Sequence, residues 1–432
     1  MFKVTSESGV SPGLLLIALL FLQGVVSLDN GLARTPPMGW LTWQRFRCET
    51  DCKTYPRDCI SEDLILRQAK ALVSGGWKDR GYRYVVIDDC WPSYQRNPET
   101  HKLVADPIRF PHGIKWLADQ IHSMGLLFGI YLDFGTRTCA GYPGSLDYLE
   151  LDAQTMAEWE VDYIKMDGCW SKVSIQPDGF AMFGRYLNAT KRPMVFGCSY
   201  PAYSHWYDGE KLNWTQLIDN CNLWRMFEDV QDSFSSVLSI MRQYEAHRRT
   251  LIPVAGPGHW NDLDMLLGGN FGLSWDETRV QMGIWAMHAS PLIISVDLED
   301  IKPEMKEILQ APLVIRINQD KLGKPADLII PEPGIKVWVR QLSDFNGGWA
   351  LAYLNLNDGA GYPIQVVCSL KELGVKAAGN KGTSFKLIDA FTGSEKLTTD
   401  LTTPFEVRVN PSGIVVLISQ PLDPNLNHAI EF

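Results

Sequence analysis

The sequence predicts a (β/α)8 barrel followed by an antiparallel β-sandwich domain, and three observations support this prediction. Short apolar runs end in a carboxylate, helix-type segments separate these runs at regular intervals, and helical spacing disappears after about residue 325. Because ionised Asp is costly to bury, acids at the same end of successive buried strands predict one shared functional rim. The runs that carry these acids are VVIDD (85–89), FGIYLD (128–133), YIKMDG (163–168) and HWNDLDM (259–265).

The predicted helices between these runs have recognisable ends. Residues 61–72 begin at Ser61 with acids in the first turn, and residues 114–125 end at Gly125, as helix caps require. A third helix is expected over 147–160. Strands that alternate with helices predict parallel βα units. The expected strands are 37–43, 85–89, 128–133, 163–168, 193–199, 222–226, 259–265 and 291–297.

Eight such repeats in about 300 residues favour a closed barrel, whose active site lies at the C-terminal ends of the strands. The alternative is an open doubly wound sheet, which would carry a Gly-rich dinucleotide fingerprint after its first strand. The sequence has no such fingerprint at that place.

Residues 335–342, 348–357, 362–370, 384–393 and 405–419 alternate apolar and polar side chains between Gly, Asn and Pro turns. This pattern predicts the antiparallel domain over residues 325–432. The barrel is then expected over residues 28–324.

Residues 1–27 read as a signal peptide. The apolar run 14–22 follows Lys3 and is too short to span a bilayer, and small residues Val25 and Ser27 precede the expected cut at Leu28. No other stretch reads as a transmembrane helix. The chain is therefore expected to be lysosomal or secreted, which gives meaning to the glycosylation sequons at Asn188 and Asn213.

Nine cysteines in a secreted chain imply disulfides, although spacing alone leaves their connectivity open. Eight of them lie in the predicted barrel, and Cys368 is expected to be a free buried thiol. A zinc site is the alternative for this cluster, but CxxC spacing is missing.

The chain has 432 residues, 45% of them hydrophobic, which is enough for a barrel core and a smaller second domain. Its formal net charge of −10 argues against nucleic acid or an anionic membrane surface as a partner, because both attract basic proteins.

Two aspartates carry the predicted chemistry. Lys165 precedes Asp167 by two positions on the same strand face, and its ammonium is expected to keep Asp167 ionised as a nucleophile. Asp229 stands at the expected start of a helix, four residues after Arg225. The alternative interpretations are a structural Lys–Asp pair and a helix N-cap. Two opposed carboxylates are what glycoside hydrolysis requires.

Other rim residues suit a sugar. Asp88 and Asp89 both reach a ligand only if the strand ends beside them, and carboxylates bind hydroxyl groups strongly. Several aromatic side chains offer flat faces to a pyranose, although Trp40 is expected in the core. These aromatic residues are Trp40, Trp43, Tyr131 and Tyr203.

The strings TPPMGWLTW, IDDCW, GIYLD, KMDGC, WRMFEDVQDS and GPGHWNDLDM together resemble glycoside hydrolase family 27 from about Leu28 to the C-terminus. The resemblance implies that Asp167 is the nucleophile and Asp229 the acid/base. It also implies that Asp88 and Asp89 contact the 4- and 6-hydroxyl groups. Further implied sugar contacts are Trp43, Tyr131, Lys165, Arg225, Asp264 and Met265. Leu263 departs from the family's NDPDM motif, which touches loop geometry and leaves the acids in place.

The same resemblance implies four disulfides, which are Cys48–Cys90, Cys52–Cys59, Cys139–Cys169 and Cys198–Cys221. It further implies a homodimer and no metal or organic cofactor.

Substrate choice is expected to depend on CSYPAY (198–203). Galactose-selective members of the family resemble CEWPLY here, so Ser199 and Ala202, with Tyr203 beside them, leave room for an N-acetyl group. The predicted reaction is retaining, exo-acting hydrolysis of terminal α-linked N-acetylgalactosamine from a glycolipid, glycoprotein or oligosaccharide. An α-galactosidase, a dual-specificity enzyme and a catalytically silent sugar-binding protein remain alternatives.

Overall fold

The computed structural model describes residues 30–204, 206, 209, 211–357, 361–376 and 384–422. The predicted signal peptide, residues 1–27, lies outside the described residues. Within the described ranges, no helix is both long and apolar enough to cross a bilayer.

Eight parallel strands form the barrel in the order β7-β6-β5-β4-β3-β2-β1-β8. A parallel bridge between Leu266 and Ile294 joins the segment after β7 to β8, which closes the ring. The barrel strands are β1 (Met38–Leu41), β2 (Tyr84–Ile87), β3 (Leu127–Asp133), β4 (Tyr163–Asp167), β5 (Val195–Cys198), β6 (Leu223–Arg225), β7 (Trp260–Asp262) and β8 (Leu292–Ile294). The predicted barrel is therefore confirmed, and every strand except β3 is shorter than its predicted run.

The connecting helices start where the sequence provides a cap. Ser61 accepts a hydrogen bond from the Leu64 backbone N–H (3.3 Å) ahead of α2, and Ser274 with Glu277 forms a capping box on α9. The helices are α1 (Trp43–Phe46), α2 (Glu62–Ser74), η1 (Lys78–Arg80), α3 (Gly113–Ser123), α4 (Leu149–Glu158), η2 (Val173–Ile175), α5 (Gln176–Ala189), α6 (Tyr200–Tyr203), α7 (Trp214–Asn220), α8 (Phe234–Val254), α9 (Trp275–Met287), α10 (Pro303–Leu309) and α11 (Pro312–Asn318).

The C-terminal domain has a six-stranded antiparallel sheet and a two-stranded sheet, with an apolar core of their own between them. Two strands, β9 and β14, were not predicted. The alternating pattern begins only at Ile335, after β9, and the sequence of β14, EKLTT, has no apolar alternation. The strands are β9 (Asp327–Ile330), β10 (Ile335–Gln341), β11 (Trp349–Asn355), β12 (Ile364–Cys368), β13 (Phe385–Asp389), β14 (Glu395–Thr399), β15 (Phe405–Val409) and β16 (Gly413–Pro421).

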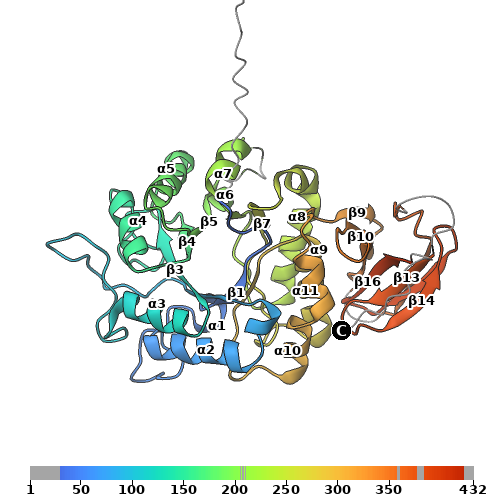
Figure 1. Cartoon of the computed structure of the whole chain (residues 1–432), viewed down its shortest axis with the longest axis horizontal. Helices are drawn as coiled ribbons and strands as arrows, with labels where there is room; N and C mark the ends of the chain where they lie inside the picture. Colours follow the sequence, from blue (N-terminus) through green and yellow to red (C-terminus); the bar gives the residue numbers. More distant parts are fainter. Residues whose placement is uncertain are drawn as a thin grey trace, which may run out of the picture.

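The larger C-terminal sheet packs against the barrel through α9, which contacts β10, β11 and β16 (Figure 1). Trp338 of β10 and Val416 of β16 belong to the same apolar cluster as the barrel core. The two domains are therefore joined by a continuous hydrophobic interface rather than by a hydrated contact.

Four disulfides join the same cysteine pairs that the family resemblance implies: Cys48–Cys90, Cys52–Cys59, Cys139–Cys169 and Cys198–Cys221. All eight are oxidised, so none supplies the thiolate that a zinc ion would need. Cys368 is free and buried, as predicted.

His288 lies fully buried at the domain interface, stacked on Tyr244 (ring centroids 4.0 Å apart) and edge-on to Trp338 (4.6 Å). Burial, with the nearby Arg340 charge, lowers the pKa of His288 from 6.5 to about 3. Unfolded His binds a proton below about pH 6.5. The neutral folded form therefore loses stability as pH falls from 6.5 towards 3.

We expect His288→Leu to lose less stability on acidification than the wild type. The difference should be about 2 kcal/mol at pH 5 relative to pH 7.5, measured by urea unfolding at each pH. His101→Leu, at an exposed position, is the control and should follow the wild type. Equal acid sensitivity of wild type and His288→Leu would contradict the prediction.

Candidate active site

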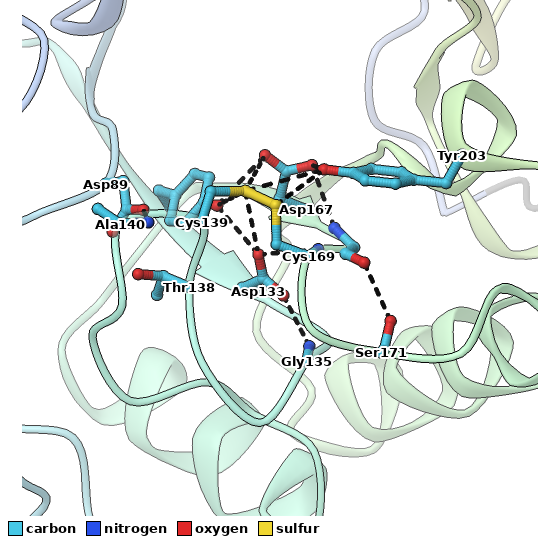
Figure 2. The surroundings of a disulfide bond; sticks show 12 residues. Asp89, Asp133, Gly135, Thr138, Cys139, Ala140, Asp167, Cys169, Ser171 and Tyr203 are labelled. Atoms are coloured by element: carbon cyan, nitrogen blue, oxygen red, sulfur yellow. Dashed lines mark hydrogen bonds between the residues drawn. A yellow bond between two sulfur atoms is a disulfide. The ribbon is translucent and has the colours of Figure 1, made fainter.

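Asp167, the last residue of β4, is held by two tyrosine hydroxyls. Tyr203 of α6 donates to its Oδ1 at 2.5 Å, and Tyr131 of β3 lies 3.2 Å from its Oδ2. Figure 2 shows the Tyr203 ring pointing at the carboxylate from the opposite side of the site to Asp89. These contacts fix the carboxylate at the C-terminal mouth of the barrel.

Lys165 does not form the structural ion pair with Asp167 that was the alternative interpretation. The Lys165 ammonium instead pairs with Asp88 Oδ2 at 2.7 Å. Asp88 follows β2, two strands from β4, and the Lys165 side chain reaches it through the barrel interior. Burial raises the pKa of Asp167, and the Lys165 charge opposes this shift without overcoming it. Lys165 therefore favours the ionised form of Asp167 only from a distance.

Asp229 does not begin a helix, which corrects the sequence interpretation. Helix α8 begins at Phe234 with Ser233 as its N-cap, so Asp229 lies in the preceding loop and its side chain is 56% exposed. Arg225, at the end of β6, donates to Asp229 Oδ1 at 3.0 Å. Desolvation would raise the pKa of Asp229, but Arg225 and then Lys165 outweigh it and hold this pKa below its ordinary value.

Arg225 also binds a second carboxylate. Its guanidinium lies 3.0 Å from Asp264 Oδ2, and the same oxygen accepts the Val230 backbone N–H at 2.8 Å. Burial raises the pKa of Asp264 to about 6, against the effect of Arg225. Arg225 thus ties the end of β6 to the acidic loop after β7.

Strand β2 ends at Ile87, so both following acids leave the strand geometry as the sequence analysis required. Both are almost fully buried. Asp89 Oδ2 accepts the Ala140 backbone N–H at 2.9 Å, and burial raises the pKa of Asp89 to about 6. Together with Lys165-bound Asp88, this places two acceptors on the β2 side of the mouth.

Two adjoining hollows occupy the mouth. The outer pocket, of about 200 Å³, is lined by both Asp167 and Asp229. The inner cavity, of about 20 Å³, is a narrow extension that shares Ser199 and Arg225 with the outer pocket. The outer pocket is therefore the one with room for a sugar ring. The outer pocket is lined by Asp167, Ser199, Ala202, Tyr203, Arg225, Phe227, Glu228 and Asp229, and the inner cavity includes Lys165, Asp262, Asp264 and Met265.

The remaining predicted residues lie around these hollows rather than in their linings. Trp43 is in α1, under the Arg47 guanidinium at 5.4 Å, and Tyr131 presents its hydroxyl to the acids rather than a ring face. Trp40 is fully buried in the core, as expected.

Three acids at this site received no individual role from the sequence. Asp262 lies in the inner cavity, and Glu228 lies in the outer pocket. Asp133 contacts Tyr131 at 3.1 Å behind Asp167. Asp133 and Asp262 are strand-end acids, so the signal was present, but one sequence does not tell which neighbours they meet. Glu228 has no comparable signal.

Both predicted glycosylation positions are exposed. Asn188 lies in the last turn of α5, and Asn213 caps α7 by accepting the Gln216 backbone N–H at 3.1 Å. Modification of either residue stays a prediction.

Comparisons with known proteins agree over almost the whole chain. A family model described as alpha galactosidase A matches residues 35–320, and one for the alpha galactosidase A C-terminal beta sandwich domain matches residues 323–413. The chain is 47% identical over 408 residues to alpha-N-acetylgalactosaminidase of Rattus norvegicus, covering 94% of this chain and 96% of that protein.

It is also 44% identical over 400 residues to alpha-galactosidase A of Homo sapiens, covering 92% of this chain and 91% of the relative. Among solved structures, alpha-galactosidase I from Mortierella vinacea superposes with a TM-score of 0.79 at 32% identity, covering 90% and 98% of the two chains.

Proposed function

The chain belongs to the alpha galactosidase A family and is a glycoside hydrolase, and from this premise we propose that it removes terminal α-linked N-acetylgalactosamine with retention of configuration. One observation carries the proposal: Asp167 and Asp229 line the same pocket at the C-terminal mouth of the barrel. Retaining hydrolysis needs two carboxylates that face one sugar from opposite sides.

In the proposed mechanism, Asp167 attacks the anomeric carbon while Asp229 protonates the departing oxygen. Asp229 then takes a proton from the water that releases the sugar from Asp167. The Tyr203 and Tyr131 hydroxyls support the role of Asp167, because they hold its carboxylate in place for attack. The exposure of Asp229 supports its role, because it must meet both the leaving group and water.

The substrate assignment depends on the wall formed by Ser199 and Ala202, both of which line the outer pocket. Their small side chains support a site with room for an acetamido group beside the sugar 2-position. The relatives include both an alpha-N-acetylgalactosaminidase and an alpha-galactosidase, so a galactosidase or dual-specificity enzyme is the second candidate. A hydrophobic void penalises a smaller sugar by only about 1–3 kcal/mol, so galactose should still be a weak substrate.

A panel of aryl α-glycosides, assayed at acidic and neutral pH, tests the proposal. We expect kcat/KM to be highest for the N-acetylgalactosaminide, with the α-anomer of the sugar appearing first in the NMR spectrum of the product. A preference for the galactoside would favour the second candidate. Sugar binding without turnover would favour a silent binding protein.

Asp229 predicts an acidic pH dependence for poor leaving groups. Because Arg225 lowers the pKa of Asp229, the protonated acid becomes abundant only as pH falls. As pH rises, kcat/KM for a methyl α-glycoside should begin to fall at a lower pH than kcat/KM for a 2,4-dinitrophenyl α-glycoside, because the dinitrophenolate leaves without protonation. Superimposable pH profiles would remove Asp229 from the proton-donor role.

We also propose that the enzyme reaches an acidic lysosomal or extracellular compartment by the secretory route. Four disulfides support this assignment, since they persist in oxidising compartments. The homodimer stays a prediction, as does action on a glycolipid, glycoprotein or oligosaccharide.

A further inference from the structure

Asp133 is a buried acid that the proposed mechanism does not use. It is the last residue of β3, paired in register with Asp167 at the end of β4, and its side chain is almost fully buried. Figure 2 shows the Cys139–Cys169 disulfide between the two carboxylates, and the Cys139 sulfur lies 3.6 Å from Asp133 Oδ2 and 3.5 Å from Asp167 Oδ2. Two carboxylates in such proximity do not both ionise readily.

The Tyr131 hydroxyl lies between these acids. Its oxygen is 3.1 Å from Asp133 Oδ2 and 3.2 Å from Asp167 Oδ2. A phenol carries one proton, so it donates to one carboxylate at a time. If both acids were ionised, Tyr131 could donate to only one of the two oxygens, and its own oxygen would face the other carboxylate with no proton between them. The Cys139 sulfur, 3.5 Å from Asp167 Oδ2, belongs to a disulfide and has no proton to offer instead.

A proton on Asp133 removes this conflict. The acid then donates to the Tyr131 oxygen, and the Tyr131 proton is free for Asp167. The backbone holds Asp133 in the required orientation, because the Gly135 N–H donates to Oδ1 at 2.7 Å and the Cys169 N–H to Oδ2 at 3.2 Å. A Cβ on Gly135 would meet the Cys169 carbonyl oxygen at 1.8 Å, so only glycine permits this approach of the two loops.

We propose that Asp133 is a positioning residue, neutral in the resting enzyme, that donates to Tyr131 and thereby directs the Tyr131 hydroxyl onto the nucleophile Asp167. This inference depends on the proposed function, because it takes Asp167 as the nucleophile. Two carboxylates sharing one proton would keep Asp167 ionised while Asp133 stays neutral. Asp133 touches no reacting atom and acts through Tyr131.

The charges around this pair agree with the assignment. Burial, and then the Asp167 charge, raises the pKa of Asp133 to about 8. The Lys165 charge lowers the pKa of Asp167 against the effect of burial, and its ammonium lies 5.5 Å from the centre of the Tyr131 ring. The other titratable groups facing the pair are Asp88, Asp89, Tyr131, Tyr203 and Asp229.

Two variants with a 2,4-dinitrophenyl α-N-acetylgalactosaminide test the proposal, since this leaving group makes kcat/KM insensitive to the acid Asp229. Asp133→Ala removes the donor and should lower kcat/KM at pH 5 about 100-fold. Asp133→Asn keeps an N–H towards Tyr131, although it loses the hydrogen bond from the Cys169 N–H. Its kcat/KM should therefore be at least tenfold higher than that of Asp133→Ala. In a Tyr131→Phe background, the difference between Asn and Ala should disappear.

The pH profile separates this role from a merely structural one. Wild-type kcat/KM should fall above about pH 8 as Asp133 ionises, and Asp133→Asn should abolish that fall. An unchanged alkaline limb in Asp133→Asn, or equal activity of the Asn and Ala variants, would overturn the proposal. If Asp133→Ala does not fold, the Asn variant and its pH profile still decide the matter.

An infrared difference spectrum between pH 6.5 and pH 9.5 gives a readout independent of turnover. We expect the wild-type difference spectrum to show the loss of a protonated-carboxyl band between these two pH values. The Asp133→Asn spectrum should lack this difference band. The Asp89→Asn spectrum should still show it, because Asp89, whose pKa is about 6, titrates at lower pH. Absence of this band in an active enzyme would overturn the proposed neutral Asp133 and leave the proposed function in place. Its presence in a protein that hydrolyses no α-glycoside would support the neutral Asp133 and reject the proposed function.

Discussion

Asp167→Asn is expected to lower kcat for an activated aryl α-N-acetylgalactosaminide by about 10⁴-fold, a typical loss when a catalytic residue is removed. The amide has the size of the carboxylate and can still meet Tyr203, so the substitution removes nucleophilicity with little change in shape. Because the leaving group is activated, loss of acid catalysis does not obscure the result. Steady-state rates and the covalent mass of the protein after rapid quenching measure both turnover and intermediate.

The control for this variant is Asp119→Asn, an exposed acid of α3 that pairs with Lys115. It should retain wild-type kcat, which excludes a general effect of charge removal. Wild-type turnover in Asp167→Asn would reject the nucleophile assignment and, with it, the role of Asp133.

Replacing both Ser199 and Ala202, by Glu and Leu respectively, should reverse the sugar preference. The larger side chains fill the space beside the 2-position, and overpacking against an acetamido group costs about 1–3 kcal/mol for each clash. We therefore expect kcat/KM for the N-acetylgalactosaminide to fall about 100-fold or more, while the galactoside is unchanged or improved. The ratio of kcat/KM on the two aryl glycosides measures the switch.

The galactoside serves as an internal control in this experiment, because a misfolded protein would lose both activities together. The single variants Ser199→Glu and Ala202→Leu show which wall matters more. An unchanged ratio in the double variant would mean that these two positions do not select the substrate.

Local pattern in the sequence determined the architecture. Apolar runs of strand length, helix caps such as Ser61 and the recurring strand-end acids are encoded within a few residues of one another, so they predicted the barrel, the C-terminal sheets and the acids of the mouth. The family motifs added a pairing of cysteines that spacing alone left open. The strand β14 was not predicted because its polar sequence has no strand pattern, and it is a strand only through its antiparallel pairing with β13.

The electrostatics of the site were decided only by tertiary structure. Lys165 pairs with Asp88, 77 residues away, instead of with Asp167 two residues away, because the closed barrel brings their side chains together across its interior. In the same way, Asp229 meets Arg225 outside any helix, and Asp133 and Asp167 come within reach of one tyrosine hydroxyl. Sequence fixes which ionisable groups exist and at which strand ends they stand. Their distances and burial, which set each pKa, follow only from how the strands close.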